Sequence, residues 1–168
     1  MPAANGKGRA SYADGQLFLS PTWIHTVAEA VRTARQTDSY FRQLTSGFTQ
    51  RVAYLINDIP RELSEHYGGG NCVVIQVQLD KGVLRGIRIG AESPNGKVDL
   101  TVTCDYQVAR QLFQGELGPA SAFLNRRFQI EPFRALYRKP QLAAKSIVAG
   151  NVVLRIARRV PTVFLPVR

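Results

Sequence analysis

The sequence predicts an α+β domain in which a mainly antiparallel sheet of about five strands is covered by helices, some of them N-terminal to the sheet. Apolar residues recur at helical spacing before Gly68, alternate at strand spacing from Val73 to Cys104, and return to helical spacing afterwards. A chain of 168 residues suits a single hydrophobic core. We therefore expect a disordered tail over residues 1–15 and one domain over residues 16–168.

The N-terminal third carries two amphipathic segments that predict helices. Ser20 can cap a helix and Pro21 fits its first turn, so the first helix is expected to begin there. The apolar stripe of the first helix comprises Ile24, Val27, Ala28, Val31 and Ala34, and that of the second segment comprises Phe48, Val52, Leu55, Ile56 and Ile59. Pro60 interrupts the second segment. A short helix is expected over Glu62–Tyr67, and the glycines 68–70 end the helical region.

Alternating residues after the glycine run predict three strands. The first two, Val73–Leu79 and Val83–Ile89, are joined by a hairpin turn at Asp80–Gly82. Ser93–Gly96 is a second turn signal, and the third strand follows over Val98–Cys104. Each strand has one apolar side, which is typical of an antiparallel meander with one buried and one solvated face.

Helical and strand patterns then alternate towards the C-terminus. Asp105 is placed to cap a helix that Gly115 ends, and Gly118–Pro119 opens a second short helix. Arg127–Glu131 reads as a fourth strand.

The last part of the chain is less regular. Residues Leu142–Ala149 are expected to be helical, whereas Asn151–Ala157 could extend that helix or form a strand, which their β-branched residues slightly favour. Phe164 and Leu165 are too apolar to extend freely into water.

Charge and motifs restrict the function. The formal net charge of +10 favours anionic partners, including acidic membrane surfaces. The aromatic residues follow the core periodicity and do not alternate with the arginines, which argues against a nucleic-acid binder. Cys72 and Cys104 match no zinc or redox spacing, so no metal or cofactor is expected and both thiols should be buried and reduced. No apolar run reaches the ~20 residues of a membrane-spanning helix and the N-terminus does not resemble a secretory signal, which predicts a soluble, cytoplasmic protein.

Three stretches of the sequence resemble the sterol carrier protein family. They are DLTVTCD at Asp99–Asp105, QLFQGELGP at Gln111–Pro119 and AFLNRRFQI at Ala122–Ile130, in the order and at the spacings typical of that family. One departure is Glu131–Pro132, where the family usually has Gly-Asp, so the chain is expected to leave the sheet differently there.

The resemblance implies a curved sheet and covering helices that enclose an apolar tunnel for sterols, fatty acyl chains or similar lipids. It implies a non-enzymatic lipid-binding or lipid-transfer protein without catalytic residues. The residues expected to line the tunnel are Ile75, Val77, Leu100, Val102, Leu112, Phe113, Phe123, Leu124 and Phe128. Each of them, taken alone, fits an ordinary closely packed core better than a ligand contact.

Three other functions stay open at this point. The domain could be an interaction or accessory module with a collapsed cavity that docks on an enzyme or self-associates, which the apolar segment at Phe164 and Leu165 favours. It could be a small enzyme in which Glu131, just after an apolar strand, is a perturbed carboxylate. A nucleic-acid binder is the third alternative.

Overall fold

The computed structural model describes residues 15–91 and 96–167. The predicted N-terminal tail, apart from Gly15, and most of the predicted turn at Ser93–Gly96 lie outside these residues. In chain order the elements are β1 (Gln16–Leu17), α1 (Pro21–Thr37), α2 (Ser39–Thr45), β2 (Gln50–Asn57), α3 (Arg61–Ser64), the 3₁₀ turn η1 (Glu65–Tyr67), β3 (Cys72–Asp80), β4 (Val83–Gly90), β5 (Leu100–Asp105), α4 (Tyr106–Gln114), α5 (Pro119–Leu124), β6 (Gln129–Glu131), α6 (Arg134–Arg138), α7 (Pro140–Ala157) and β7 (Thr162–Val163).

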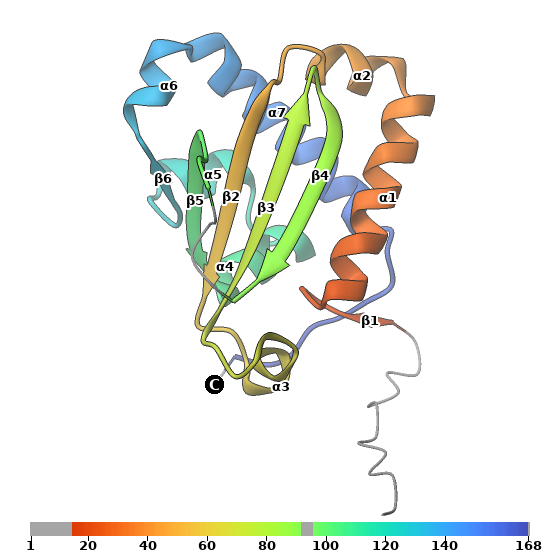
Figure 1. Cartoon of the computed structure of the whole chain (residues 1–168), viewed down its shortest axis with the longest axis vertical. Coiled ribbons are helices and arrows are strands. Elements are labelled where there is room, and N and C mark those ends of the chain that lie inside the picture. Colours follow the sequence, from red (N-terminus) through yellow and green to blue (C-terminus); the bar gives the residue numbers. More distant parts are fainter. Residues whose placement is uncertain (1–14, 92–95, 168) are drawn as a thin grey trace, which may run out of the picture.

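The main sheet confirms the predicted α+β class and has the order β4-β3-β2-β5-β6. All neighbouring strands are antiparallel except β2 and β5, which run parallel, so the sheet is mixed. The prediction that the third alternating segment continues a meander is wrong. That segment is β5, which lies on the far side of β2 from the β3–β4 hairpin (Figure 1).

The prediction of a second amphipathic helix before Pro60 is also wrong, because Gln50–Asn57 is the central strand β2. Val52 and Ile56 point to one face of the sheet and Ala53 to the other, and all three are buried. A central strand that is buried on both faces has no clean alternation, so its apolar residues also satisfied a helical spacing.

The slight preference for a strand at Asn151–Ala157 is wrong as well. These residues form the second half of α7, which continues through Gly150. This half buries Leu154, Ile156 and Ala157. Helix α7 contacts α1, α2, α4, α5 and α6 and passes behind the sheet (Figure 1). Tertiary packing therefore outweighs the β-propensity of the valines and isoleucine.

Several predicted helix ends and turns are confirmed. The Ser20 side chain accepts a hydrogen bond from the backbone N–H of Trp23 at 3.2 Å, at the start of α1. Gly115 ends α4 with a φ of 86°. Lys81 and Gly82 form the β3–β4 hairpin turn with φ angles of 47° and 77°. Asp105 stands at the N-cap of α4, but its side chain makes no capping hydrogen bond.

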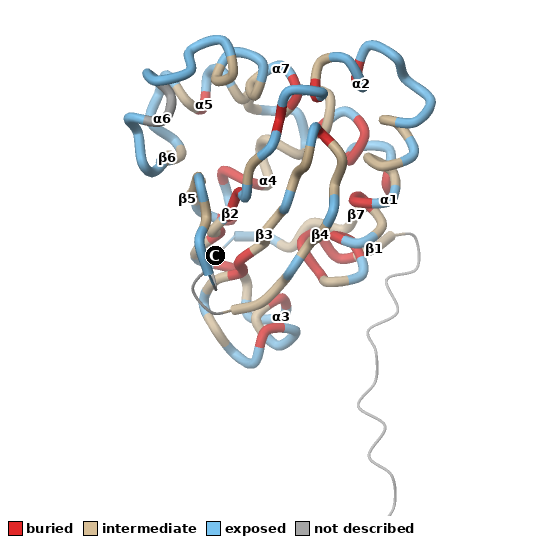
Figure 2. Tube along the Cα trace, turned by 45° about the horizontal axis from the view of Figure 1, so that its top comes forward, coloured by how far each residue is buried: buried red, intermediate tan, exposed pale blue. Residues whose placement is uncertain are grey.

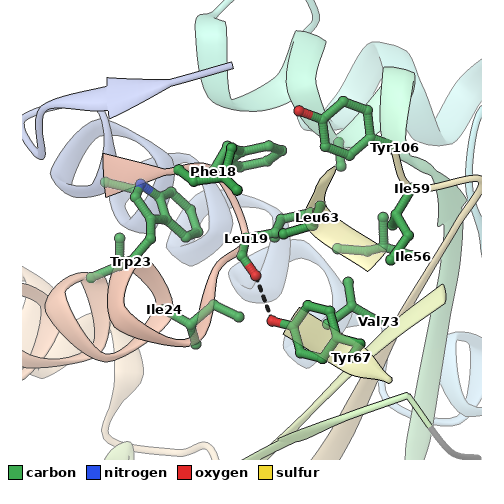
Figure 3. Close-up of a cluster of buried hydrophobic side chains, with 14 of the residues drawn as sticks. Phe18, Leu19, Trp23, Ile24, Ile56, Ile59, Leu63, Tyr67, Val73 and Tyr106 are labelled. Carbon is green, nitrogen blue, oxygen red and sulfur yellow. Dashed lines mark hydrogen bonds between the residues drawn. The ribbon is translucent and has the colours of Figure 1, made fainter. Parts of the chain in front are cut away.

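The main core lies at one end of the sheet, where α1, α3 and α4 meet (Figure 3). Phe18 and Tyr106 are completely buried there. The Tyr67 hydroxyl donates a hydrogen bond to the Leu19 carbonyl at 2.5 Å. Phe164 packs against this core, 4.9 Å from the Phe18 ring, as expected from its apolar character.

Candidate apolar binding site

One face of the main sheet is apolar from edge to edge, and we call it the inner face. The strand registers place the following side chains on it: Val52, Tyr54 and Ile56 of β2, Val73, Ile75 and Val77 of β3, Ile87 and Ile89 of β4, Leu100, Val102 and Cys104 of β5, and Ile130 of β6. Helix α1 contacts β4, and α4 contacts β2 and β5. The inner face is therefore the helix-covered face, and its chemistry suits apolar contacts.

Burial differs along the inner face. Ile56 and Val73, at the end nearest the main core, are 5% and 0% exposed. The next row across the sheet pairs Tyr54 with Ile75 and Val102, Ile75 with Ile89, and Val102 with Ile130. We call these five residues the middle row. Tyr54 is 41% exposed and the other four are half-buried, so this row is less completely buried than Ile56 and Val73.

Tyr54 shows that the middle row is accessible but sheltered. Desolvation raises the pKa of its phenol, so the hydroxyl lies among many protein atoms. The same residue nevertheless keeps 41% of its surface accessible. The ring of Tyr54 is therefore partly accessible, while its hydroxyl lies close to other protein atoms.

The structure brings together the four predicted site residues that lie on β3 and β5. Ile75 and Val102 belong to the middle row, and Val77 and Leu100 flank Val52 in the next row. The sequence interpretation missed Tyr54, although its alternation with Val52 and Ile56 was a usable signal. That signal was lost once the segment had been read as a helix.

The remaining predicted residues fall into two groups, one of which contains Phe128: the prediction that Phe128 lies on a strand is wrong, because β6 begins at Gln129. Phe113 packs in the main core, with its ring 5.1 Å from Phe18 and 5.2 Å from Trp23. Leu112 precedes it on α4 and is half-buried. Its carbonyl accepts a hydrogen bond from Arg158 at 2.8 Å.

The second group surrounds α5 and α6. The Phe123 ring lies 6.0 Å from Phe128 and 6.4 Å from Phe133. Leu124, in contrast, is 77% exposed. The nine predicted residues thus belong to the sheet face, the main core and the group around α5 and α6, and their binding of a ligand stays a prediction.

Two open pockets in the described part of the chain lie away from the middle row. The larger, about 560 Å³, has a lining that includes Trp23, Phe113 and Phe164. Arg158 is at its rim, but its guanidinium already donates to the carbonyls of Leu112 and Phe113 at the end of α4. A second pocket of about 240 Å³ lies beside α4, between Arg110 and Pro166.

Ionisable groups are sparse near the inner face. Burial, with a contribution from Asp105, raises the pKa of the Cys104 thiol from 9.0 to about 12. Glu131 is exposed. Its neighbour across the β5–β6 register is Thr101, so its side chain lies on the face of the sheet opposite to the inner face. Within residues 15–91 and 96–167, no three histidine, cysteine, aspartate or glutamate side chains are grouped as metal ligands would be. No helix in those ranges has the length and apolar character needed to cross a membrane.

The arrangement of helices and strands matches known structures. A conserved hypothetical protein from Thermus thermophilus, described as a candidate sterol carrier protein, superposes with a TM-score of 0.63 over 89% of this chain and 94% of its own, at 17% identity. The chain has the sterol carrier protein fold. The crystal structure of sterol carrier protein 2 gives a TM-score of 0.60 over 80% of this chain and 95% of its own, at 19% identity. No protein-family model and no curated protein sequence matches the chain.

Proposed function

We propose that the chain is a non-enzymatic lipid-binding or lipid-transfer protein that holds an apolar ligand against the inner face of its sheet. The observation that carries this proposal is the middle row, an apolar strip on the helix-bearing face of the sheet that stays partly accessible, with Tyr54 41% exposed at its centre. The proposal takes this partly accessible apolar strip as the floor of a recess that a ligand fills, because ordinary cores are closely packed.

The chemistry of the recess favours a ligand with a long or broad apolar body and little polar surface. Burial of apolar surface contributes about 25 cal/mol per Å², so an acyl chain or a sterol skeleton would gain most of its affinity from the isoleucines and valines. The Tyr54 hydroxyl is the polar group of the middle row, and it can donate to or accept from one oxygen of the ligand. This combination fits a fatty acid, an acyl ester or a sterol.

The sterol carrier protein fold supports the proposal, because proteins carrying that name share the arrangement of helices and strands. One observation that favoured an interaction module is weakened. Phe164 and Leu165 pack against the chain's own main core and are half-buried, so they do not form a free docking segment.

A binding titration with a fluorescent fatty acid tests the proposal. Val102→Trp places a large side chain in the middle row, and Thr101→Trp places the same side chain on the opposite face of the same strand as a matched control. We expect Val102→Trp to weaken binding at least about tenfold, because a large ring occupies the recess, while Thr101→Trp binds like the parent.

Thermal unfolding of both variants distinguishes a recess from a packed core. A tryptophan forced into a closely packed core typically costs about 1–3 kcal/mol, whereas in a recess Val102→Trp is expected to melt within a few degrees of the parent. No binding by the parent, or equal binding by all three proteins, would contradict the proposed function.

A further inference from the structure

We propose that the corner of the molecule formed by α5, β6 and α6 docks on bilayers that contain anionic lipid. This docking surface, which we call the α5–α6 face, comprises the apolar side chains Leu124, Phe133 and Tyr137 and the basic side chains Arg126, Arg127, Arg134, Arg138 and Lys139. It goes beyond lipid binding by the inner face, because it requires no ligand inside the protein.

The apolar residues of the α5–α6 face are unusually exposed. Leu124 and Tyr137 are 77% and 72% exposed, the highest values among the large hydrophobic residues of the described chain, and Phe133 is 50% exposed. Phe133 and Tyr137 form a group with Phe123, next to Leu124 in the sequence, since the Phe133 ring lies 5.2 Å from Tyr137 and 6.4 Å from Phe123. Figure 2 shows that β6 and α6 are mostly exposed. A grouped, exposed apolar surface of this kind marks an interaction site.

The charges of the α5–α6 face identify an anionic partner. Residues 124–139 contain five basic residues and a single acidic one, Glu131. All five basic residues are exposed. Within the described ranges, the ion pairs are Arg32 with Glu29 and Arg85 with Asp80, both on other elements, so no carboxylate neutralises these five cations.

A bilayer fits this surface better than a nucleic acid does. The sequence-based expectation that aromatic residues are separated from arginines does not hold here, because Phe133 and Tyr137 alternate with Arg134 and Arg138. However, Phe123 and Phe133 lie nearly parallel, with 21° between their ring planes, so one face of each ring is turned towards the other ring. Leu124, the most exposed apolar residue, can enter a headgroup region but offers no stacking surface for a base.

Docking at this corner would also place the inner face near the membrane. Ile130 belongs to both β6 and the middle row, so the α5–α6 face adjoins the open end of the proposed recess. This consequence, unlike the docking itself, rests on the proposed function: a lipid could pass between bilayer and recess with a short path through water.

Vesicle sedimentation with the full chain tests the docking surface. The parent is expected to bind phosphatidylcholine vesicles that contain phosphatidylglycerol, to bind pure phosphatidylcholine vesicles weakly, and to lose binding as salt is raised. The triple variant Arg134→Gln/Arg138→Gln/Lys139→Gln should bind the anionic vesicles about a hundredfold more weakly. Each basic residue near an anionic surface contributes about a factor of five to the affinity. The double variant Leu124→Ser/Tyr137→Ser should bind these vesicles about tenfold more weakly, because it removes apolar contacts with the bilayer interior.

A matched control removes the same charge elsewhere. Arg51, Arg61 and Arg88 are exposed and belong to β2, α3 and β4, outside the α5–α6 face. The variant Arg51→Gln/Arg61→Gln/Arg88→Gln should keep most of the vesicle binding. An equal loss in this control would overturn the proposal, because net charge and not a defined surface would then explain the binding. Equal binding of the parent to neutral vesicles would overturn it as well.

Two further measurements separate this inference from its alternatives. Fatty-acid titration of the same variants should be unchanged, so a failure of docking and a failure of ligand binding can be told apart. Fluorescence anisotropy with a single-stranded oligonucleotide should show no binding that depends on the α5–α6 face. Strong oligonucleotide binding that the triple variant loses, without vesicle binding by the parent, would replace the bilayer with a nucleic acid and overturn the proposal.

Discussion

Phe113→Ala and Phe123→Ala should destabilise the protein to different extents, although the sequence alone treats the two phenylalanines as equivalent. Phe113 contacts both Phe18 and Trp23 in the main core, with ring separations of 5.1 and 5.2 Å. Phe123 contacts Phe128 and Phe133 at 6.0 and 6.4 Å, in a group that is open to solvent on one side. The truncation at 113 therefore removes contacts with two buried rings of the main core, whereas the truncation at 123 removes contacts with rings of a more exposed group.

The expected magnitudes follow from these surroundings. Truncation of a fully buried phenylalanine costs about 3–5 kcal/mol, and an aromatic pair adds about 0.5–1.5 kcal/mol beyond the buried area. For the half-buried Phe113, with two close rings, we expect a loss of about 3 kcal/mol in the free energy of unfolding. For Phe123 we expect about 1 kcal/mol. For a domain of this size the corresponding decreases in Tm are roughly 6–12 °C and 2–4 °C.

Urea unfolding followed by tryptophan fluorescence measures both losses. Trp23 is the single tryptophan of the chain and lies in the main core, so its emission reports global unfolding. The slope of the free energy against urea concentration should be the same for parent and variants if the transition stays two-state. Equal destabilisation by the two substitutions, or a larger loss for Phe123→Ala, would refute the division of these residues into a packed core and an open cluster.

Three other predictions concern groups whose surroundings are well defined. Tyr67→Phe should lower the free energy of unfolding, measured in urea, by about 1–3 kcal/mol, because the buried Leu19 carbonyl loses the hydroxyl that donates to it at 2.5 Å. An unchanged urea midpoint would show that this hydrogen bond does not stabilise the fold. Burial raises the pKa of Cys104 to about 12, above its ordinary value of 9.0, so the folded state holds this proton more tightly than the unfolded state does. The free energy of unfolding should then fall as pH rises from about 9 to 12, by up to about 1.4 kcal/mol per pH unit for this group, and the fall should be smaller in Cys104→Ser; the same pH dependence in both proteins would rule the thiol out as its source. Gly82→Ala should lower Tm, because Gly82 has a φ of 77° and an added Cβ would collide with the Thr45 backbone; a parent-like Tm would show that the hairpin can relax around a methyl group.

The sequence predicted those parts of the fold that local chemistry determines. The Ser20 cap, the Lys81–Gly82 turn and the Gly115 helix end each depend on a few adjacent residues, and all are present in the structure. The alternating strands were found for the same reason, because a strand with one apolar face has a period of two.

The errors arose where distant contacts decide the outcome. Strand β2 is buried on both faces only because β3 and β5 flank it, and β5 is separated from it by more than forty residues of chain. The second half of α7 is helical because it packs on several other helices, which outweighs its β-branched composition. Neither contact can be read from the residues of the segment itself.

The candidate site was predicted in part for the same reasons. Ile75, Val77, Leu100 and Val102 share a face because alternation fixes which side of a strand a residue occupies. Tyr54 was missed because its strand was read as a helix. That Phe113 and Phe123 lie in separate clusters depends on how α4 and α5 are placed against the sheet, and short helices joined by glycines do not specify that placement locally.

Native mass spectrometry of the protein purified without organic solvent tests the central claim most directly. If the recess over the middle row holds a lipid, the spectrum should show a mass above that of the polypeptide, and solvent extraction should remove this excess and release an identifiable acyl or sterol compound. Protein stripped in this way should take up an added fatty acid, and Val102→Trp should take up less. Polypeptide mass alone in every preparation, with no uptake of added fatty acid or sterol, would contradict the account and leave the inner face as a structural surface only.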